Sequence, residues 1–439
     1  MRAKDLFGQF SQNRILGGAA VLAVLQFGSS FAGLIRDRVL ASTFPGLDVV
    51  DVYIAAFRPS DLLFQMCISA GFSVALVPLL SKYWSNKDGK NMSDLLSSVV
   101  SVAALLFGFV ALLTAIFFNH IAPLLTQFTG ESLDLYIAFG RIALLTNFLF
   151  VFGNAFGQYL ITVQRYWLYG ITPILYTLGT ICGTLFLTPY IGAYGPIIGS
   201  LIGAVLYVIF RLFAVVRSGF KPSISIWHPD INEMLLLMLP RVLALGALQV
   251  ELLIFDRVAS GLGSGSVTIN AYARNFQSVV VGIAGIALAQ SAFSLLSQSA
   301  AANEWNRFMV YLRKGILMML AITIPGSIAL YALAPIAARL VNISHVLSVF
   351  SICLLFYAIS IPFESVNHLL LRSFYSLKQT ALPAIFSVIN GAVAITFAWY
   401  FASSYGVYAI AIGFTIGQIV QLVGLSVLLP WQIKMRRRA

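Results

Sequence analysis

Long apolar runs occur regularly along the chain, separated by short segments that carry charged residues, glycine or proline. Each run is about 20 residues long or longer, which is the length of helix that crosses a bilayer. Membrane strands would instead show short segments of alternating apolar and polar residues. The pattern predicts twelve membrane-spanning helices, at residues 15–35, 50–80, 96–118, 134–160, 168–188, 193–216, 232–254, 267–297, 313–334, 346–371, 379–401 and 405–429.

The first six predicted helices and the last six carry related sequences. Ile-Arg-Asp-Arg-Val at residues 35–39 recurs as Ile-Phe-Asp-Arg-Val at 254–258, a shift of 219 (254 minus 35). Arg58 follows Ala-Ala-Phe, and Arg274 follows Ala-Tyr-Ala, a shift of 216 (274 minus 58). Six spans per half leave both halves in the same orientation, as in parallel repeats about an axis along the membrane normal. We therefore expect an all-α polytopic membrane protein with two six-helix lobes related by a pseudo-two-fold axis.

The domain organisation follows from these spans. The basic stretch 1–14 predicts a cytoplasmic interfacial segment, and the polar stretch 217–231 predicts a cytoplasmic linker. The two lobes are then expected at 15–216 and 232–429, with a basic cytoplasmic tail at 430–439.

Composition and charge agree with a membrane protein. The 439 residues are 59% hydrophobic and 10% charged, with a mean hydropathy of +0.91, whereas soluble domains carry about 25% charged residues. The net charge of +12 is best explained by lysines and arginines in cytoplasmic loops, not by nucleic-acid binding. Most of the 27 basic residues fall in predicted inner segments, Arg211 among them. Both termini are therefore expected to be cytoplasmic.

Several arginines fall within predicted spans or at their outer ends. An arginine at the bilayer centre costs at least about 2.5–3.5 kcal/mol on insertion scales, so these side chains should face a bundle interior or a water-filled cavity. Guanidinium groups suit anions, and phosphates in particular. The candidate substrate-binding residues are Arg36, Arg38, Arg58, Arg241, Arg257 and Arg274. The acids at the same level are Asp37, Asp51, Glu251 and Asp256.

A purely structural interpretation remains open for some of these residues. Asp37 and Arg38, like Asp256 and Arg257, could simply pair or cap helix ends. Glu364 and His368 lie one helical turn apart, where they could relay a proton, hold a cation or form a stabilising pair. The sequence contains no Walker loop, zinc-ligand spacing or Ser-His-Asp arrangement. We therefore expect a transporter without cofactor or metal, driven by a coupling ion or the membrane potential.

At three segments the chain resembles the MurJ (MviN) family of lipid II flippases, of the multidrug/oligosaccharidyl-lipid/polysaccharide exporter superfamily. These are Gly-x-x-Arg-Asp at 33–37, Asp-x-Tyr-x-x-Ala-Phe at 51–57 and Gly-Phe-Ser-x-Ala-x-Val-Pro at 71–78. The resemblance implies two six-helix lobes flanking a cationic cavity. It also implies movement of an undecaprenyl-pyrophosphate-linked peptidoglycan precursor to the outer leaflet of a bacterial inner membrane by alternating access. Arg36 and Asp51 match positions essential in that family.

The chain departs from the family pattern at several places. Ser30 stands where the family often has an arginine, and Ser69 stands where it has a glutamate. Arginines common in the family after its Asn-Leu-Leu segment are absent around residues 61–65. Typical members also have two further C-terminal spans.

Together the residues and the resemblance predict a flippase for lipid-linked oligosaccharides. The six arginines would hold the pyrophosphate, and the coupling or positioning groups would be Asp37, Asp51, Asp256, Glu364 and His368. The expected partners are the lipid-linked precursor, membrane lipids and cell-wall synthesis proteins.

Three alternatives to a flippase predict different residues in the membrane. Another exporter of the superfamily could move polysaccharide units, or drugs against cations, although a drug antiporter would need a net acidic cavity. An enzyme acting on polyprenyl phosphates would show clustered acids or histidines on the inner face. A non-transporting cell-wall scaffold would not need arginines in the bilayer.

Overall fold

The computed structural model describes residues 14–69, 72, 76–223 and 227–438, and the side chains of these except 14–20, 69, 235–245 and 437–438. The predicted interfacial segment 1–14 lies almost entirely outside the described residues. Residues 71 and 73–75 of the third family-like segment and the side chain of Arg241 also lie outside the described part.

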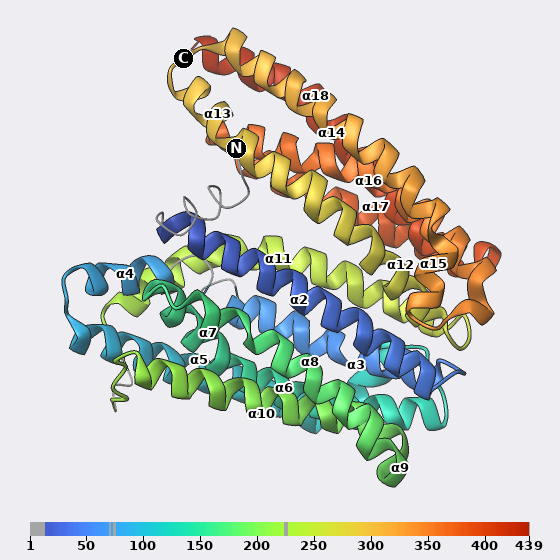
Figure 1. Ribbon diagram of the computed structural model, residues 1–439. Helices are drawn as coiled ribbons and strands as arrows, with labels where there is room; N and C mark the ends of the chain where they lie inside the picture. Colours follow the sequence, from blue (N-terminus) through green and yellow to red (C-terminus); the bar gives the residue numbers. More distant parts are fainter. Residues whose placement is uncertain (1–13, 70–71, 73–75, 224–226, 439) are drawn as a thin grey trace, which may run out of the picture. The chain divides into compact units, whose positions relative to one another are not determined.

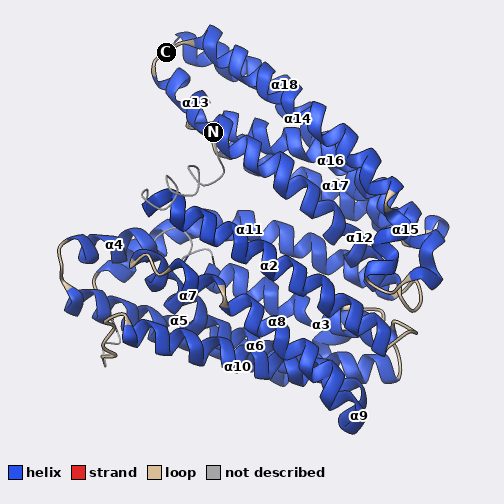
Figure 2. Ribbon diagram, viewed as in Figure 1, coloured by secondary structure: helices blue, strands red, loops and turns tan. Residues whose placement is uncertain are grey.

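The described residues form helices and no strand (Figure 2). The segments of the first half are Arg14–Thr43 (α2), Asp48–Phe64 (α3), Gln65–Ser69 (η1), Val77–Ser85 (α4), Gly89–Leu125 (α5), Glu131–Thr162 (α6), Tyr166–Gly170 (α7), Thr172–Cys182 (α8), Gly183–Leu187 (η3), Thr188–Ile191 (α9), Gly192–Tyr194 (η4) and Gly195–Arg217 (α10). Those of the second half are Asp230–Ser260 (α11), Ser266–Val280 (α12), Val281–Ile286 (η5), Ala287–Ala301 (α13), Trp305–Ala332 (α14), Ala334–Leu340 (α15), Ser344–Val346 (η6), Leu347–Ser376 (α16), Ala381–Tyr405 (α17) and Tyr408–Arg438 (α18).

Within the described residues, each of the twelve predicted spans is occupied by a helix or by several helical segments. Within the described residues, 8 helical stretches are long and apolar enough to cross a membrane, and one of them, Tyr166–Arg217, contains two predicted spans. The predicted all-helical polytopic class is therefore confirmed. One detail differs: α18 continues through most of the stretch predicted as a tail, since it ends at Arg438.

The chain packs as two compact units (Figure 1). Unit 1 contains the chain up to Pro45, Ala55–Leu124 and Thr129–Gln249, and unit 2 contains Gly46–Ile54, Leu125–Phe128 and Val250–Ala439. Helices α3 and α11 therefore each contribute residues to both units. The predicted lobes at 15–216 and 232–429 come from the sequence repeat, so their boundary stays a prediction beside this division by contacts.

Unit 1 contains a close contact between small residues of neighbouring helices, α8 with η3 on one side and α10 on the other. A Cβ atom added at Gly199 would lie 2.6 Å from the Cα of Gly183, and one added at Gly179 would lie 2.4 Å from the Cα of Gly203. These glycines repeat every four residues, so they line one face of each helix. Small residues at this spacing let membrane helices approach until their backbones touch.

Arg211 does not lie in an inner segment, where the sequence had predicted it. Its side chain is 1% exposed and lies inside unit 1 on α10, and not in an inner loop. Its Nε donates to Thr172 Oγ1 at 2.8 Å, Nη1 to the Gly153 carbonyl at 2.7 Å and Nη2 to the Tyr169 carbonyl at 3.1 Å. The guanidinium also lies 4.2 Å from the ring centre of Tyr207. Arg211 therefore crosslinks helices and does not report the orientation of the chain in the membrane.

The linker between the halves is attached to α4 on the predicted inner side. Tyr83 Oη donates to Asp230 Oδ2 at 2.7 Å, and Lys82 Nζ lies 3.8 Å from the same oxygen. His228 packs edge-on against the Tyr83 ring. Partial burial and the bond to Asp230 raise the pKa of Tyr83 to about 12, so its hydroxyl keeps the proton that it donates.

The two halves share a structural irregularity as well as a sequence repeat. A π-helical segment begins at Gln65 after α3, and another begins at Val281 after α12, a shift of 216 (281 minus 65). This is the same shift that relates Arg58 to Arg274. The structure therefore supports the repeat at the second span of each half, by a feature that the residue pattern did not reveal.

The glycine contact gives a direct test of the packing in unit 1. Gly199→Ala should destabilise the protein by about 1–3 kcal/mol, because the new methyl group meets backbone atoms that cannot move alone. Gly33→Ala in α2 is the matched control, since a Cβ there meets nothing within 4 Å. The thermal unfolding midpoint of each purified variant in detergent would measure the difference. Equal midpoints for the two variants would contradict this account of the α8–α10 contact.

Candidate functional site

In unit 1, Arg36 and Asp37 form an ion pair on α2. Arg36 donates from Nε and Nη2 to Asp37 Oδ1 at 3.0 and 2.7 Å. The Asp37 side chain is 6% exposed and that of Arg36 is 27% exposed, so the acid is buried while the arginine reaches the surface of the unit. Arg38, the next residue, is exposed. Asp37 thus holds the Arg36 guanidinium by two hydrogen bonds, and its coupling or positioning role stays a prediction.

The second cluster of unit 1 joins α3 to α6. Asn147 Nδ2 donates to Asp61 Oδ1 at 3.0 Å and to Ser60 Oγ at 2.7 Å. Arg58 lies one turn before Asp61 on α3, so its positive charge acts on that carboxyl group. Arg58 therefore has an acid, Asp61, near it. The sequence had marked residue 61 only as part of a segment that departs from the family pattern.

In unit 2, Arg274 on α12 faces Glu251 on α11. Arg274 Nη1 lies 4.0 Å from Glu251 Oε1, and the guanidinium lies 4.7 Å from the ring centre of Phe414 on α18. Both side chains are mostly buried, with 19% and 7% exposed, yet neither of these two atoms has a hydrogen-bond partner. The charges compensate each other, and the hydrogen-bonding capacity of these atoms is unused in this conformation.

Arg257 is placed at the end of α11. Its guanidinium lies 5.6 Å from the Trp399 ring centre, and its backbone carbonyl accepts from Ser260 Oγ at 2.8 Å and Gln127 Nε2 at 3.3 Å. Its neighbour Asp256 is 4% exposed. The last candidate arginine, Arg241, lies on α11 within unit 1, where the side chain is not described.

Asp51 caps the N-terminus of helix α12. It is 1% exposed, and its carboxylate accepts from the Gly265 backbone N–H at 2.7 Å, the Thr268 N–H at 2.7 Å and Thr268 Oγ1 at 2.5 Å. The helix has no side-chain cap of its own, because Gly265 occupies the N-cap position. A carboxylate at a helix N-terminus satisfies unpaired N–H groups and the positive end of the dipole. Asp51 thus fastens a segment from the first half of the chain to the second half.

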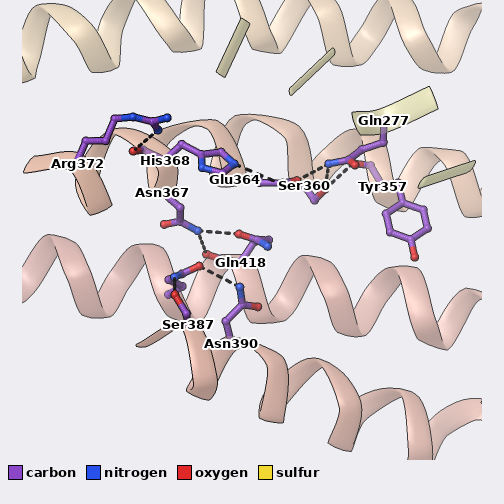
Figure 3. Close-up of polar contacts among 11 residues, drawn as sticks. Gln277, Tyr357, Ser360, Glu364, Asn367, His368, Arg372, Ser387, Asn390 and Gln418 are labelled. Atoms are coloured by element: carbon purple, nitrogen blue, oxygen red, sulfur yellow. Dashed lines mark hydrogen bonds and ion pairs between the residues drawn. The ribbon is translucent and has the colours of Figure 1, made fainter. Parts of the chain in front are cut away.

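A row of polar side chains crosses unit 2 between α12 and α16 (Figure 3). Gln277 Nε2 donates to Glu364 Oε2 and lies 3.4 Å from Ser360 Oγ. His368 Nε2 lies 4.0 Å from Glu364 Oε1, which is within ion-pair range but too long for a hydrogen bond. The predicted proximity of Glu364 and His368 is therefore correct, and Gln277 is the partner that sequence reasoning missed.

More amides extend this network towards α17 and α18. Asn367 Nδ2 donates to Gln418 Oε1 at 2.9 Å, and Asn390 Nδ2 donates to Gln421 Oε1 at 2.9 Å. All four side chains are buried. The sequence marks these four residues only as uncharged amides inside apolar spans. An uncharged amide points to a functional site less clearly than a charged residue in the membrane does.

The carboxyl–amide bridges of the two units occupy corresponding places in the repeat. Asp61 and Gln277 differ by 216 (277 minus 61), and Asn147 and Glu364 differ by 217 (364 minus 147). In each unit the second span of the half is bonded to the fourth, but the carboxyl and the amide have exchanged helices. Each bridge lies one turn after an arginine, Arg58 or Arg274.

The candidate residues are thus divided between the units. Unit 1 holds Arg36, Arg38 and Arg58, and unit 2 holds Arg257 and Arg274. Within the described part of the chain, no three His, Cys, Asp or Glu residues are arranged to hold a metal ion. A role of these arginines in binding a substrate stays a prediction.

The Asp51 contact generates a stability prediction. Asp51→Ala and Thr268→Ala should each destabilise the protein by about 0.5–2 kcal/mol, the usual range for loss of a helix cap. The double variant should lose less than the sum of the two, since Asp51→Ala already removes the hydrogen bond to the Thr268 hydroxyl. Thermal unfolding of the four proteins measures this, with Thr268→Ser as the control that keeps the hydroxyl. Fully additive losses would show that the two residues act independently.

Comparisons with known proteins agree with this architecture. The sequence matches the family described as "Lipid II flippase MurJ" over residues 40–437. A probable lipid II flippase MurJ of Bdellovibrio bacteriovorus is 22% identical over 440 residues, covering 95% of this chain and 82% of the relative. A probable lipid II flippase MurJ of Thermotoga maritima is 26% identical over 411 residues, covering 91% of this chain and 82% of the relative.

Solved structures show the same fold. A lipid II flippase MurJ in an inward closed conformation superposes with a TM-score of 0.79 at 23% identity, covering 94% of this chain and 87% of that one. An inward-facing MATE multidrug transporter superposes with a TM-score of 0.76 at 15% identity, covering 94% of this chain and 96% of that one. Because the family match extends over most of the sequence, this chain belongs to the lipid II flippase MurJ family.

Proposed function

We propose that this chain moves lipid II, an undecaprenyl-pyrophosphate-linked peptidoglycan precursor, from the inner to the outer leaflet of a bacterial inner membrane. The family match over residues 40–437 is the observation that carries the proposal. The helical membrane fold and the intramembrane arginines support it, since a pyrophosphate needs cationic partners inside the bilayer. Both termini would lie in the cytoplasm, as the predicted inner loops hold most of the lysines and arginines.

The arginines would bind the pyrophosphate, and their acidic neighbours would hold them ready for it. The candidates are Arg36, Arg38, Arg58, Arg241, Arg257 and Arg274. A buried guanidinium without a partner is costly, so an acid such as Asp37 or Glu251 offsets its charge while no substrate is present. The pyrophosphate would then compete for the same guanidinium with two or more oxygens in a bidentate geometry.

The contacts around Asp51 attach part of the first half of the chain to unit 2. Residues 46–54 and 125–128 come from the first half of the chain but pack in unit 2. Residues 46–54 are held there by Asp51, which accepts a hydrogen bond from the Thr268 N–H on α12. Residues 125–128 are held by the Gln127 backbone N–H, which donates to Ser260 Oγ at 2.9 Å. These contacts lie at the predicted outer ends of the spans.

A drug antiporter is the principal alternative within the superfamily. The likeness to a MATE transporter is at 15% identity and concerns the fold alone. The candidate arginines favour an anionic substrate over a cationic drug. Participation of cell-wall synthesis proteins as partners stays a prediction.

The arginine roles can be tested in cells depleted of their own lipid II flippase. Arg58→Ala and Arg274→Ala should each fail to restore growth, because loss of hydrogen bonds to a charged group costs about 1.5–3 kcal/mol each, roughly tenfold to a hundredfold in affinity. Lysine at either position should restore growth partly, since it keeps the charge and loses the fork geometry.

The matched control is Arg307→Ala, which removes an exposed arginine paired with Glu304 and should restore growth fully. Immunoblots of the membrane fraction would establish equal expression of all variants. Normal growth with either Arg58→Ala or Arg274→Ala would exclude that residue from the proposed site.

A further inference from the structure

The interior of unit 2 holds more acids than bases near Arg274. The charged groups that act on the Glu364 carboxyl are Arg274 on α12 and Glu251 on α11. Glu364 bonds to Gln277, one turn after Arg274 on α12, and Glu251 lies 4.0 Å from Arg274. Two carboxyl groups therefore lie near one guanidinium in a region of low dielectric, where two carboxylates disfavour each other's ionised form. Charge balance at this place is reached when one of the two carboxyl groups carries a proton.

Glu364 is the less buried of the two acids. The Glu251 side chain is 7% exposed and faces Arg274, whereas the Glu364 side chain is 21% exposed. Its neighbour His368 is 30% exposed and lines a cavity of about 340 Å³ together with Gln290, Phe293, Leu371, Arg372 and Tyr375. The cavity therefore begins one helical turn from the Glu364 carboxyl.

The polar groups on α16 form a row along one face of the helix (Figure 3). Glu364, His368 and Arg372 are spaced four residues apart, so the row covers about 12 Å at 1.5 Å per residue. Arg372 lies at the predicted inner end, where Nη1 donates to the His368 carbonyl at 3.2 Å and Nη2 to Gln290 Oε1 at 3.0 Å. A small rotation of the imidazole would close the 4.0 Å gap between His368 and Glu364.

The surroundings of Glu364 contain few other charges. Gln277 on α12 donates to the carboxyl and is neutral. On α16 itself the titratable neighbour is His368, whose own charged neighbour is Arg372. Within the described chain, α13, α14 and α18 place no charged group that acts on this carboxyl, although they pack against α16. A change of charge on Glu364 would therefore be felt mainly by Arg274 and Glu251.

The corresponding place in unit 1 provides an internal comparison. Asp61 takes the place of Gln277, and the charge acting on it comes from Arg58. One carboxyl group there faces one guanidinium, and its other neighbours are the hydroxyl of Ser60 and the amide of Asn147. With one acid and one base, the charge count at this place needs no bound proton.

We propose that Glu364 binds and releases a proton during each transport cycle, with His368 and the adjoining cavity as its route to water on the predicted inner side. The carboxylate accepts a proton from water in one conformation and returns it to water on the opposite side in the other. Uptake on the outer side and release through His368 would move one proton inward as the lipid moves outward. Proton binding stands without the proposed flippase function, and only its coupling to transport rests on that function.

Infrared difference spectroscopy of the full-length protein in lipid membranes tests the proton site. A pH step should produce the C=O band of a protonated buried carboxyl group in the wild type, and Glu364→Gln should lose that band. Glu304→Gln removes an exposed carboxylate and Asp61→Asn removes the balanced one, so both should keep it. Glu364→Asp should keep a shifted band and shows that the fold tolerates changes here. Persistence of the full band in Glu364→Gln, or its loss in Asp61→Asn alone, would overturn the proposal.

Transport of lipid II in proteoliposomes under an imposed pH gradient tests the coupling. One proton per lipid predicts about a tenfold change in the steady-state ratio between leaflets for each pH unit. Glu364→Gln should abolish this response, and His368→Gln should slow it without changing the ratio. Translocation by Glu364→Gln that still follows the gradient would overturn the proton role but leave the flippase function standing. If the wild type did not translocate lipid II, the flippase proposal would fail, and the infrared band alone would decide the proton site.

Discussion

Placing a guanidinium group among apolar helices is expensive, and the arrangement of side chains around the arginines of this chain reflects that cost. Arg211 is satisfied by neutral acceptors and aromatic rings. Arg36 and Arg274 are instead matched to carboxylates, Asp37 and Glu251. The first solution fixes an arginine permanently, whereas the second leaves a charge that a stronger anionic ligand can take over. The difference separates structural from candidate functional arginines better than depth in the membrane does.

Much of the fold was predictable because run length alone specifies a membrane helix. The spacing of the sequence repeat was also sufficient to identify Arg58 and Arg274 as equivalent residues. Other features depend on contacts between distant segments, which no local pattern encodes. Asp51 meets Thr268 across 217 residues of sequence, and its cap replaces one that α12 lacks. Arg211 resembled an inner-loop residue because it lies near the end of an apolar run.

The candidate site shows the same division between local and distant information. Glu364 and His368 were recognisable, since ionisable groups are rare in apolar spans and helical spacing places them together. Gln277 was not, because an amide contributes little to charge patterns. Its importance comes from its position opposite Glu364 and one turn from Arg274. The reversed order of amide and carboxyl in unit 1 leaves that unit with a balanced pair, so duplicated scaffolds can hold chemically different interiors.

The matching π-helical segments have a consequence for the origin of the chain. A π-turn usually arises when one residue is inserted into an α-helix, and such insertions persist where they serve a function. The segments beginning at Gln65 and Val281 occupy the same place in the two halves. The simplest history is a single insertion in an ancestral six-helix protein, inherited by both copies when its gene doubled. The distortion would then be older than the two-lobed transporter itself.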